Sequence, residues 1–252
     1  MSKSGTVPAV VKKPMTFGQT REICSALVHA MPITIDFDQA EKLVKEKREW
    51  QRRVGNFLIG ATDDAVNIGN DLEWWEQYYL DQHQRRIDLN KLTVPTLPTG
   101  RFRQPTLLVV DPNLSLDQIY RVNEVAFPCF RYTKNLDQAV TINQPRPESV
   151  YALWTEGAVE PSEEYSNLSP DQLDQRGLIY STIGERMLLE ALHHQKIEGG
   201  HLDLINVTIT SSRYSDGRAV GAAWDGRQFK VGWWLRDGAN PNGRTREVVL
   251  NS

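Results

Sequence analysis

The stretch Leu204–Leu235 decides the fold class: LINVTITSSRYSDGRAVGAAWDGRQFKVGWWL. Apolar and polar residues alternate along three runs in it, which is the pattern of half-buried β-strands. Asp216-Gly217 and Asp225-Gly226 separate the runs, and an Asp-Gly pair in a two-residue loop is a strong hairpin signal because the turn needs positive φ. The sequence therefore predicts a three-stranded antiparallel meander. Its strands are expected at Leu204–Arg213, Arg218–Trp224 and Arg227–Leu235.

The expected turns also fix a register, which sorts the side chains into two faces. Apolar residues meet in each expected pair: Ala222 with Phe229, Val220 with Val231, and Ile209 with Trp224. A slip of one residue would move every side chain to the opposite face and destroy this match. The face expected to pack on the core carries Ile205, Val207, Ile209, Val220, Ala222, Trp224, Phe229, Val231, Trp233 and Leu235. The other face is polar and rich in small residues, with Trp234 expected to be exposed on it.

Three capping-box signatures predict helices upstream of the meander. In each, a Ser or Thr is followed three residues later by Gln or Glu, so that each side chain can accept a hydrogen bond from the other residue's backbone N–H. They lie at Ser115–Gln118, Ser169–Gln172 and Thr182–Glu185. The third opens a helix that ends at Gly199-Gly200, a residue type that helix C-termini prefer, and this helix is expected to cover the core face. Strands are expected at Thr106–Val110, Phe130–Thr133 and Ser149–Trp154.

These elements predict an α+β fold. It has an antiparallel β-sheet that contains the C-terminal three-stranded meander, helices packed on one face, and an N-terminal helical extension. Pro95, Pro98 and Pro105 forbid helix and interrupt strand ladders, so they indicate a boundary. We expect an extended arm at 1–33, a helical hairpin at 34–92, a Pro-rich linker at 93–105 and an α+β domain at 106–252.

The expected hairpin carries two features that allow another interpretation. Its second helix has two aromatic pairs spaced i,i+4, which are Trp74 with Tyr78 and Trp75 with Tyr79. These rings are expected to be buried, and a peptide- or base-stacking surface is the alternative. Its first helix has basic residues around Trp50, a combination that can serve nucleic acid. Glutamates interleave with them at pairing distance, so a solvated helix face is expected.

Composition excludes several classes of protein. The 252 residues include 29 Lys+Arg and 32 Asp+Glu, a formal net charge of −3, so a basic protein that coats nucleic acid is not expected. No window approaches the ~20 consecutive apolar residues that span a bilayer. The N-terminal lysines are not followed by an apolar core of signal-peptide length. Cys24 and Cys129 give neither a zinc-ligand spacing nor a disulfide framework. We expect a cytoplasmic protein with no membrane association.

Several motifs in the C-terminal part resemble a known family. They are FPCFRYT at 127–133, YALW at 151–154, TIGERMLLEALHH at 182–194, HLDL at 201–204, SRYSDG at 212–217 and RTREVV at 244–249. With them, the stretch from about Leu107 to Val249 resembles a family of uncharacterised bacterial proteins. The resemblance implies a bacterial origin and carries no activity, and it does not extend to the N-terminal 100 residues.

The chain lacks the phosphate loop, the dinucleotide fingerprint, the nucleophile elbow and the HExxH motif. Its densest group of ligand-type side chains is Glu190, His193, His194, His201 and Asp203. Imidazole and carboxylate together could hold Zn²⁺, Mn²⁺ or Fe²⁺, or form a general acid–base pair. A metal site would use Glu190, His194, His201 and Asp203. The alternative is that the histidines only interact with the dipole at the C-terminal end of their helix.

A second group is rich in arginine. In the expected register Arg213 points to the core face and Arg218 lies opposite Trp233. A planar guanidinium suits carboxylate or phosphate. Arg244 and Arg246 would join the group if the C-terminal tail returns to the sheet, and the four would then form an anion- or nucleotide-binding site. The alternative is that Arg218 stacks on Trp233 and the strand ends are solvated.

The leading hypothesis for function is a non-enzymatic binding or assembly module of bacterial or mobile-element origin, with no cofactor. It depends on the missing catalytic motifs and on Trp234, expected to be exposed beside Lys230 on the small-residue face. The other candidate binding residues are Arg213, Arg218, Arg244 and Arg246. The expected partner is a protein or a second copy of the chain, and nucleic acid stays open. The alternative is a metal-dependent hydrolase or nuclease whose divalent metal is held by the His/Glu/Asp group.

Overall fold

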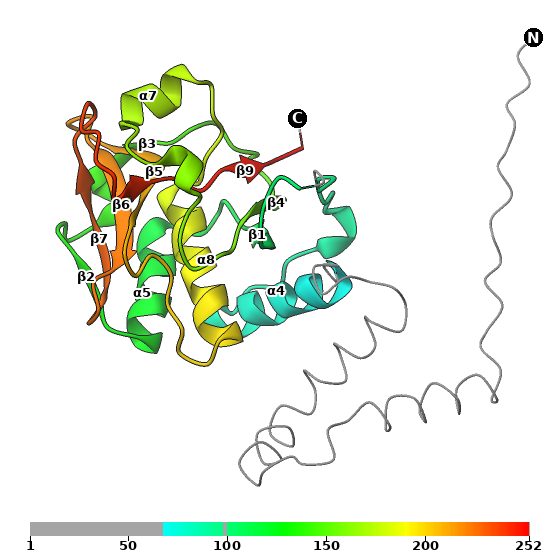
Figure 1. The fold of residues 1–252 in the computed structure, drawn as a ribbon. Coiled ribbons are helices and arrows are strands. Elements are labelled where there is room, and N and C mark those ends of the chain that lie inside the picture. Colours follow the sequence, from blue (N-terminus) through cyan, green and yellow to red (C-terminus); the bar gives the residue numbers. More distant parts are fainter. Residues whose placement is uncertain (1–67, 98–99, 252) are drawn as a thin grey trace, which may run out of the picture. The chain divides into compact units, whose positions relative to one another are not determined.

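The computed structural model describes residues 68–97 and 100–251. The chain divides into two units, Met1–Asp63 and Asp64–Ser252, and every described residue belongs to the second. Figure 1 shows the described residues in colour. The arm expected at 1–33 and the first helix of the expected hairpin, with its basic residues around Trp50, lie outside the described residues.

The described residues form helices and two β-sheets (Figure 1). The helices are α4 (Ile68–His83), α5 (Leu116–Ala126), α6 (Leu136–Ala139), α7 (Pro170–Gln175) and α8 (Ile183–Lys196), with 3₁₀ turns η1 (Leu89–Lys91) and η2 (Glu163–Tyr165). The strands are β1 (Pro105–Val110), β2 (Cys129–Arg131), β3 (Val140–Ile142), β4 (Tyr151–Glu156), β5 (Val207–Tyr214), β6 (Ala219–Trp224), β7 (Phe229–Trp234), β8 (Gly243–Arg244) and β9 (Val248–Val249). The three predicted capping boxes open α5, α7 and α8 and are confirmed.

Helix α8 packs against both sheets and forms the centre of the fold (Figure 1). The three-stranded sheet has the order β1-β4-β9, and the six-stranded sheet has the order β2-β7-β6-β5-β3 with β8 paired to β5. One hydrophobic core joins residues of both sheets and of α8, among them Leu108, Phe229 and Met187. Every residue of Ile183–Leu192 is buried, so the charged residues of α8 need partners inside the protein. The predicted α+β class is confirmed.

Helix α4 packs its aromatic rings on β1. Trp75 and Tyr79 have no exposed surface. Trp75 Nε1 donates to Leu107 O at 3.0 Å, and Tyr79 OH donates to Val109 O at 2.8 Å. These rings are therefore buried, as their i,i+4 spacing indicated. The proline-rich segment that follows α4 also lies against a strand, because Trp154 Nε1 of β4 donates to Pro95 O at 2.8 Å.

The predicted meander is present, and its second turn lies one residue later than expected. β6 and β7 pair with Ala222 opposite Val231, where the sequence predicted Phe229. The turn is at Gly226-Arg227, because Asp225 N donates to Gln228 O at 3.1 Å across it. This changes the pairing by two residues, and a two-residue shift keeps each side chain on its face. The inward-facing residues of these two strands are thus the predicted ones.

The first turn differs by a single residue, and this difference reverses the faces of β5. Tyr214 N donates to Arg218 O at 2.9 Å across a three-residue loop, where the sequence predicted a two-residue loop. Gly217 has φ +84°, the left-handed conformation that a three-residue hairpin loop needs. The additional loop residue moves the side chains of β5 to opposite faces. The observed pairs are Ile209 with Gly221 and Arg213 with Ala219.

The face away from α8 is consequently covered at one end, and Trp234 is not exposed. Trp234 packs against a second core cluster, and its indole N–H donates to Gly238 O at 2.7 Å. The cluster consists of Tyr165, Leu173, Tyr180, Ile209 and Ala219. The prediction of an exposed Trp234 was therefore wrong, because residues around α7 cover it. Three residues predicted to face the core are instead exposed at or beyond strand ends: Ile205, Trp233 and Leu235.

Candidate functional site

Phe130, Tyr132 and Lys230 form a group that we call the aromatic edge. It lies at the outermost strand of the six-stranded sheet, where β2 pairs in parallel with β7 and Phe130 lies opposite Lys230. The two rings meet edge to face with centroids 5.0 Å apart. Lys230 Nζ lies 5.7 Å from the centre of the Phe130 ring and 5.8 Å from that of Tyr132. Phe130 is 38% exposed and Tyr132 is 58% exposed, so two large rings face solvent on one strand edge.

Strand alternation explains why these rings point outward. Cys129 and Arg131 occupy the inward positions of β2: Cys129 packs on the main core, and Arg131 forms an ion pair with Asp117. The Arg131 guanidinium also lies 4.3 Å from the centre of the Tyr120 ring. Because successive side chains of a strand point to opposite faces, Phe130 must face away from the core.

Small residues continue the same face of the sheet next to the aromatic edge. Gly221 lies opposite Gly232, and Ala223 lies opposite Lys230. Tyr132 lies over Gly232, since a Cβ added there would be 3.4 Å from Tyr132 Cε2. Glycine and alanine project little beyond the backbone, so the two rings stand higher than the neighbouring part of the sheet face. Lys230 was predicted to lie on this face and does so.

A chain of buried ion pairs joins α8 to the C-terminal segment. Arg186 Nη1 donates to Glu190 at 2.7 Å, and Arg186 Nε donates to Asp203 at 2.8 Å. Arg246 donates to the other oxygen of Asp203. All four side chains have no exposed surface. Although burial acts in the opposite direction, the charges of Arg186 and Arg246 hold the pKa of Asp203 below its ordinary value.

The predicted metal ligands lie close together, but arginine occupies their carboxylates. His201 Nδ1 lies 2.8 Å from Glu190 Oε1, and the His201 ring stacks on Trp224 at a centroid distance of 3.4 Å. The ring of His194 is 4.8 Å from that of His201. Asp203 is linked to Glu190 through Arg186, which donates to both carboxylates. Within residues 68–97 and 100–251, no three His, Cys, Asp or Glu side chains are arranged to hold a metal ion.

The side chains of the four candidate arginines lie in different parts of the structure. Arg213 donates to Asp174 and to Tyr180 OH, both at 2.7 Å, on the face opposite to the predicted one. Arg218 bonds to Asp216 and lies 4.7 Å from the centre of the Trp233 ring, as the stacking alternative predicted. Arg244 donates to Pro161 O, and Arg246 belongs to the buried ion pairs. They therefore do not converge on one anion-binding site.

Comparison with known proteins adds no relative. No protein-family model matches the chain, and comparison with curated proteins and with solved structures finds no similar one. Among the helices of the described residues, none has the length and apolar character to cross a bilayer. Function is therefore inferred from the residues and their contacts.

The aromatic edge was missed at the level of sequence although a signal was present. The run FPCFRYT was predicted to contain a strand, and its alternation places Phe130 and Tyr132 on one face. What the pattern could not show is that β2 pairs with β7, a strand about 100 residues later, and ends the sheet there. Only this pairing puts Lys230 beside the two rings.

Proposed function

We propose that the chain is a non-enzymatic binding and assembly module that binds a protein partner, which includes a second copy of itself, at the aromatic edge. The exposure of Phe130, on an edge strand, and of Tyr132, directly after that strand, carries this proposal. Aromatic residues are enriched in protein interfaces, where truncation of one that is central can cost about 2 kcal/mol or more of binding. An edge strand also offers unpaired backbone N–H and C=O groups to a partner.

The state of the reactive side chains supports a module without catalysis. Glu190 and Asp203 are neutralised by arginines inside the protein. Burial raises the pKa of the Cys129 thiol to about 12, so little thiolate is present at neutral pH. These groups therefore stabilise the fold in the arrangement described.

The charge distribution favours a protein partner over nucleic acid. The formal net charge of the chain is −3, whereas nucleic-acid interfaces are strongly positive. Lys230, the cation of the aromatic edge, has Asp225 at 3.9 Å. A bacterial, cytoplasmic protein of mobile-element origin is part of the proposal as well. The bacterial origin rests on the resemblance of the C-terminal motifs, and the mobile-element origin is an analogy with other bacterial proteins.

Site-specific photo-crosslinking tests the proposal. A photoreactive phenylalanine analogue replaces Tyr132 in the full chain, and the control carries it at Val125, which is 90% exposed on α5. The samples are the purified chain and extracts of the source organism. We expect a discrete protein adduct from position 132, at twice the mass of the chain if the partner is a second copy, and none from position 125. The substitution Phe130→Ala should weaken the adduct without changing the melting temperature by more than a few degrees.

Three outcomes would contradict the proposal. Equal cross-linking from both positions would show that the aromatic edge has no special affinity. A nucleic-acid adduct from position 132 would replace the protein partner by nucleic acid. A large loss of thermal stability in the Phe130→Ala chain would show that the ring serves the fold.

A further inference from the structure

A strap of extended chain, Asn143–Glu148, links β3 to β4. Gln144 and Arg146 are half-buried, and the other residues of the strap are exposed. Alternate side chains of an extended chain point to opposite sides, and the intervening Pro145 and Pro147 favour this extended backbone. Within the described residues, no backbone group of the strap bonds to another backbone group. The strap is thus attached through its side chains.

The strap lies along the segment Leu178–Ser181. One side of this segment is paired with the C-terminal segment, as the antiparallel bridge between Tyr180 and Glu247 shows. Two backbone hydrogen bonds support the bridge: Val248 N to Ile179 O at 3.0 Å, and Ser181 N to Arg246 O at 2.9 Å. The segment therefore behaves as a strand, and among residues 68–97 and 100–251 no strand lies along its second edge.

Side chains of the strap satisfy that second edge. Gln144 Nε2 donates to Leu178 O at 3.0 Å, and Gln144 Oε1 accepts from Tyr180 N at 3.2 Å. Arg146 Nη2 donates to Tyr180 O at 2.8 Å. A carboxamide has the donor and the acceptor of a peptide group. Gln144 thus fills positions that the backbone of an added strand would otherwise fill.

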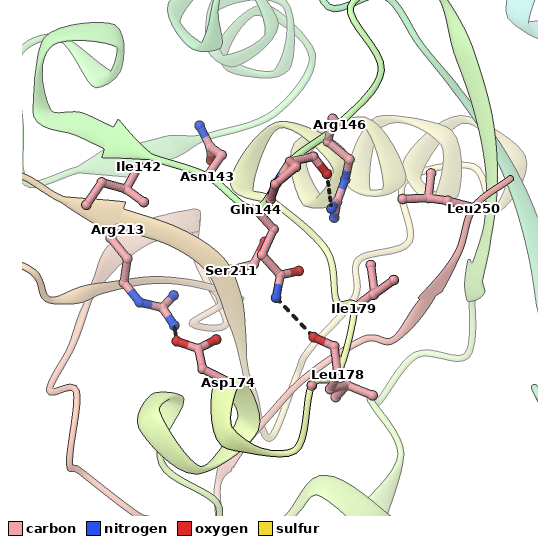
Figure 2. A pocket seen from close by; sticks show the side chains of 12 residues that line it. Ile142, Asn143, Gln144, Arg146, Asp174, Leu178, Ile179, Ser211, Arg213 and Leu250 are labelled. Atoms are coloured by element: carbon pink, nitrogen blue, oxygen red, sulfur yellow. Dashed lines mark hydrogen bonds and ion pairs between the residues drawn. The ribbon is translucent and has the colours of Figure 1, made fainter. Parts of the chain in front are cut away.

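Cavities of about 490 Å³ and 600 Å³ lie beside the strap, and Asn143, Gln144 and Arg146 line both. Figure 2 shows the smaller cavity, with Gln144 reaching to Leu178. Both volumes are in the range that holds ligands. The strap is therefore a thin partition between two hollows and not part of a packed layer.

The charges around the larger cavity favour a guanidinium. Its lining contains four carboxylates, on Asp111, Asp137, Glu148 and Glu185, and one cation, Arg146. Asp111 is already paired with Arg85, which lies outside the lining, at 2.8 Å. Glu185 has no exposed surface and receives Arg146 Nε at 2.6 Å and Nη2 at 3.1 Å. Burial of a charged group is costly unless an opposite charge pairs with it. The strap supplies the cation that this site requires.

We propose that the strap occupies, in cis, an acceptor groove for an extended, arginine-bearing peptide segment of another protein. The backbone of the peptide pairs with Leu178 and Tyr180 in place of Gln144, and its guanidinium binds Glu185 in place of Arg146. This is recognition by strand addition, with the pocket setting the specificity. Because strap and peptide compete, the groove is closed until the peptide is present. The inference does not depend on the aromatic edge.

A labelled peptide with the sequence of residues 141–149, TINQPRPES, is the probe. Its binding to the full chain is measured by fluorescence anisotropy, and the control peptide has glutamine in place of arginine. We expect measurable binding to the wild-type chain and binding at least about tenfold tighter to the Gln144→Ala/Arg146→Ala chain, where the strap no longer competes. The control peptide should bind neither the wild-type chain nor the double variant. Arg227→Ala, which removes an exposed arginine of the β6–β7 turn, should bind like the wild type.

A second measurement uses the wild-type chain and needs no variant. Displacement of the strap should speed cleavage after Glu148 by a glutamate-specific protease severalfold when the arginine peptide is added. The proposal is overturned if the peptide leaves this cleavage unchanged. It is also overturned if the folded double variant binds the two peptides equally or binds neither. If the double variant does not fold, Gln144→Ala alone replaces it in the comparison.

Discussion

Arg246 shows at the scale of one residue how a buried charge holds distant parts of the chain together. Its guanidinium donates to Glu156 O and Ala158 O at 2.8 Å and to Val159 O at 3.0 Å, in addition to Asp203. The sequence made Arg246 a candidate for anion binding, on the condition that the C-terminal tail returns to the sheet. It could not predict this environment, because most of the acceptors are carbonyls about 90 residues away, and carbonyls carry no sequence signal.

Replacing Arg246 should destabilise the protein strongly. Arg246→Met keeps much of the side-chain volume but leaves Asp203 with one arginine in place of two, and breaking a buried ion pair typically costs about 3–5 kcal/mol. Arg227→Ala, at an exposed position, should cost less than about 0.5 kcal/mol. Urea unfolding followed by circular dichroism measures both. A loss below about 1 kcal/mol for Arg246→Met would show that pairing with Arg186 alone is sufficient for Asp203.

The neighbouring residues Trp233 and Trp234 should differ sharply. Trp234 packs on the second core cluster and donates to Gly238 O, so Trp234→Ala should cost about 3 kcal/mol. Trp233 is 46% exposed and loses mainly its contact with Arg218, so Trp233→Ala should cost about 1 kcal/mol. Thermal melts of the two variants measure the difference. Equal losses would contradict the faces assigned to β7.

Acidification should destabilise the protein near pH 6. Burial lowers the pKa of His193, and burial together with the charge of His201 lowers the pKa of His194. A histidine with a lowered pKa binds its proton more readily in the unfolded chain, so stability is full above about pH 6.5 and falls as the pH drops toward the folded-state pKa. Melting temperatures between pH 7.5 and 5.5 measure this. His193→Gln/His194→Gln should flatten the profile, and an unchanged slope would assign the effect to other groups.

At the scale of elements, local signals predicted what local physics decides. The capping boxes depend on neighbouring residues and appear where expected, and both hairpin turns form within one residue of the predicted Asp-Gly pairs. The face of β5 depends on whether its loop has two or three residues. A two-residue and a three-residue version of this loop would both contain Asp216-Gly217, so the sequence did not distinguish the two lengths. Since one residue reverses a strand, this small ambiguity moved Ile209 and Arg213 to the other face.

The three-residue loop makes its own prediction at Gly217. Gly217 has φ +84°, and L-residues with a Cβ pay about 1–2 kcal/mol in the left-handed region. The nearest atom to an added Cβ is Arg236 Cδ at 3.4 Å, so Gly217→Ala should cost about 1 kcal/mol through backbone strain alone. Ser215→Ala in the same loop should be nearly neutral. Chemical denaturation of both variants tests this, and a neutral Gly217→Ala would contradict the positive φ assigned to Gly217.

At the scale of the whole molecule, the fold class was predictable and the candidate site was not. Periodicity indicates which residues are buried, and α8 with the meander was recognised in this way. The aromatic edge and the strap both depend on which segments meet across the chain. Lys230 lies beside Phe130 because β2 pairs with β7, and Gln144 lies beside Tyr180 because the strap runs along the segment Leu178–Ser181. A single sequence does not encode such pairings in a local pattern.

The position of α4 leads to a prediction for fragments of the chain. Trp75 and Tyr79 are fully buried, and they donate to carbonyls of β1 at Leu107 and Val109. A fragment that begins at Thr106 exposes the apolar surface of β1 and loses both bonds, whereas one that begins at Asp64 keeps them. We expect cooperative melting from residues 64–252 and aggregation or non-cooperative melting from residues 106–252. Differential scanning calorimetry distinguishes the two. If the shorter fragment melts cooperatively within a few degrees of the longer one, the buried rings of α4 contribute little, and the Pro-rich segment is a true linker between independently folding parts.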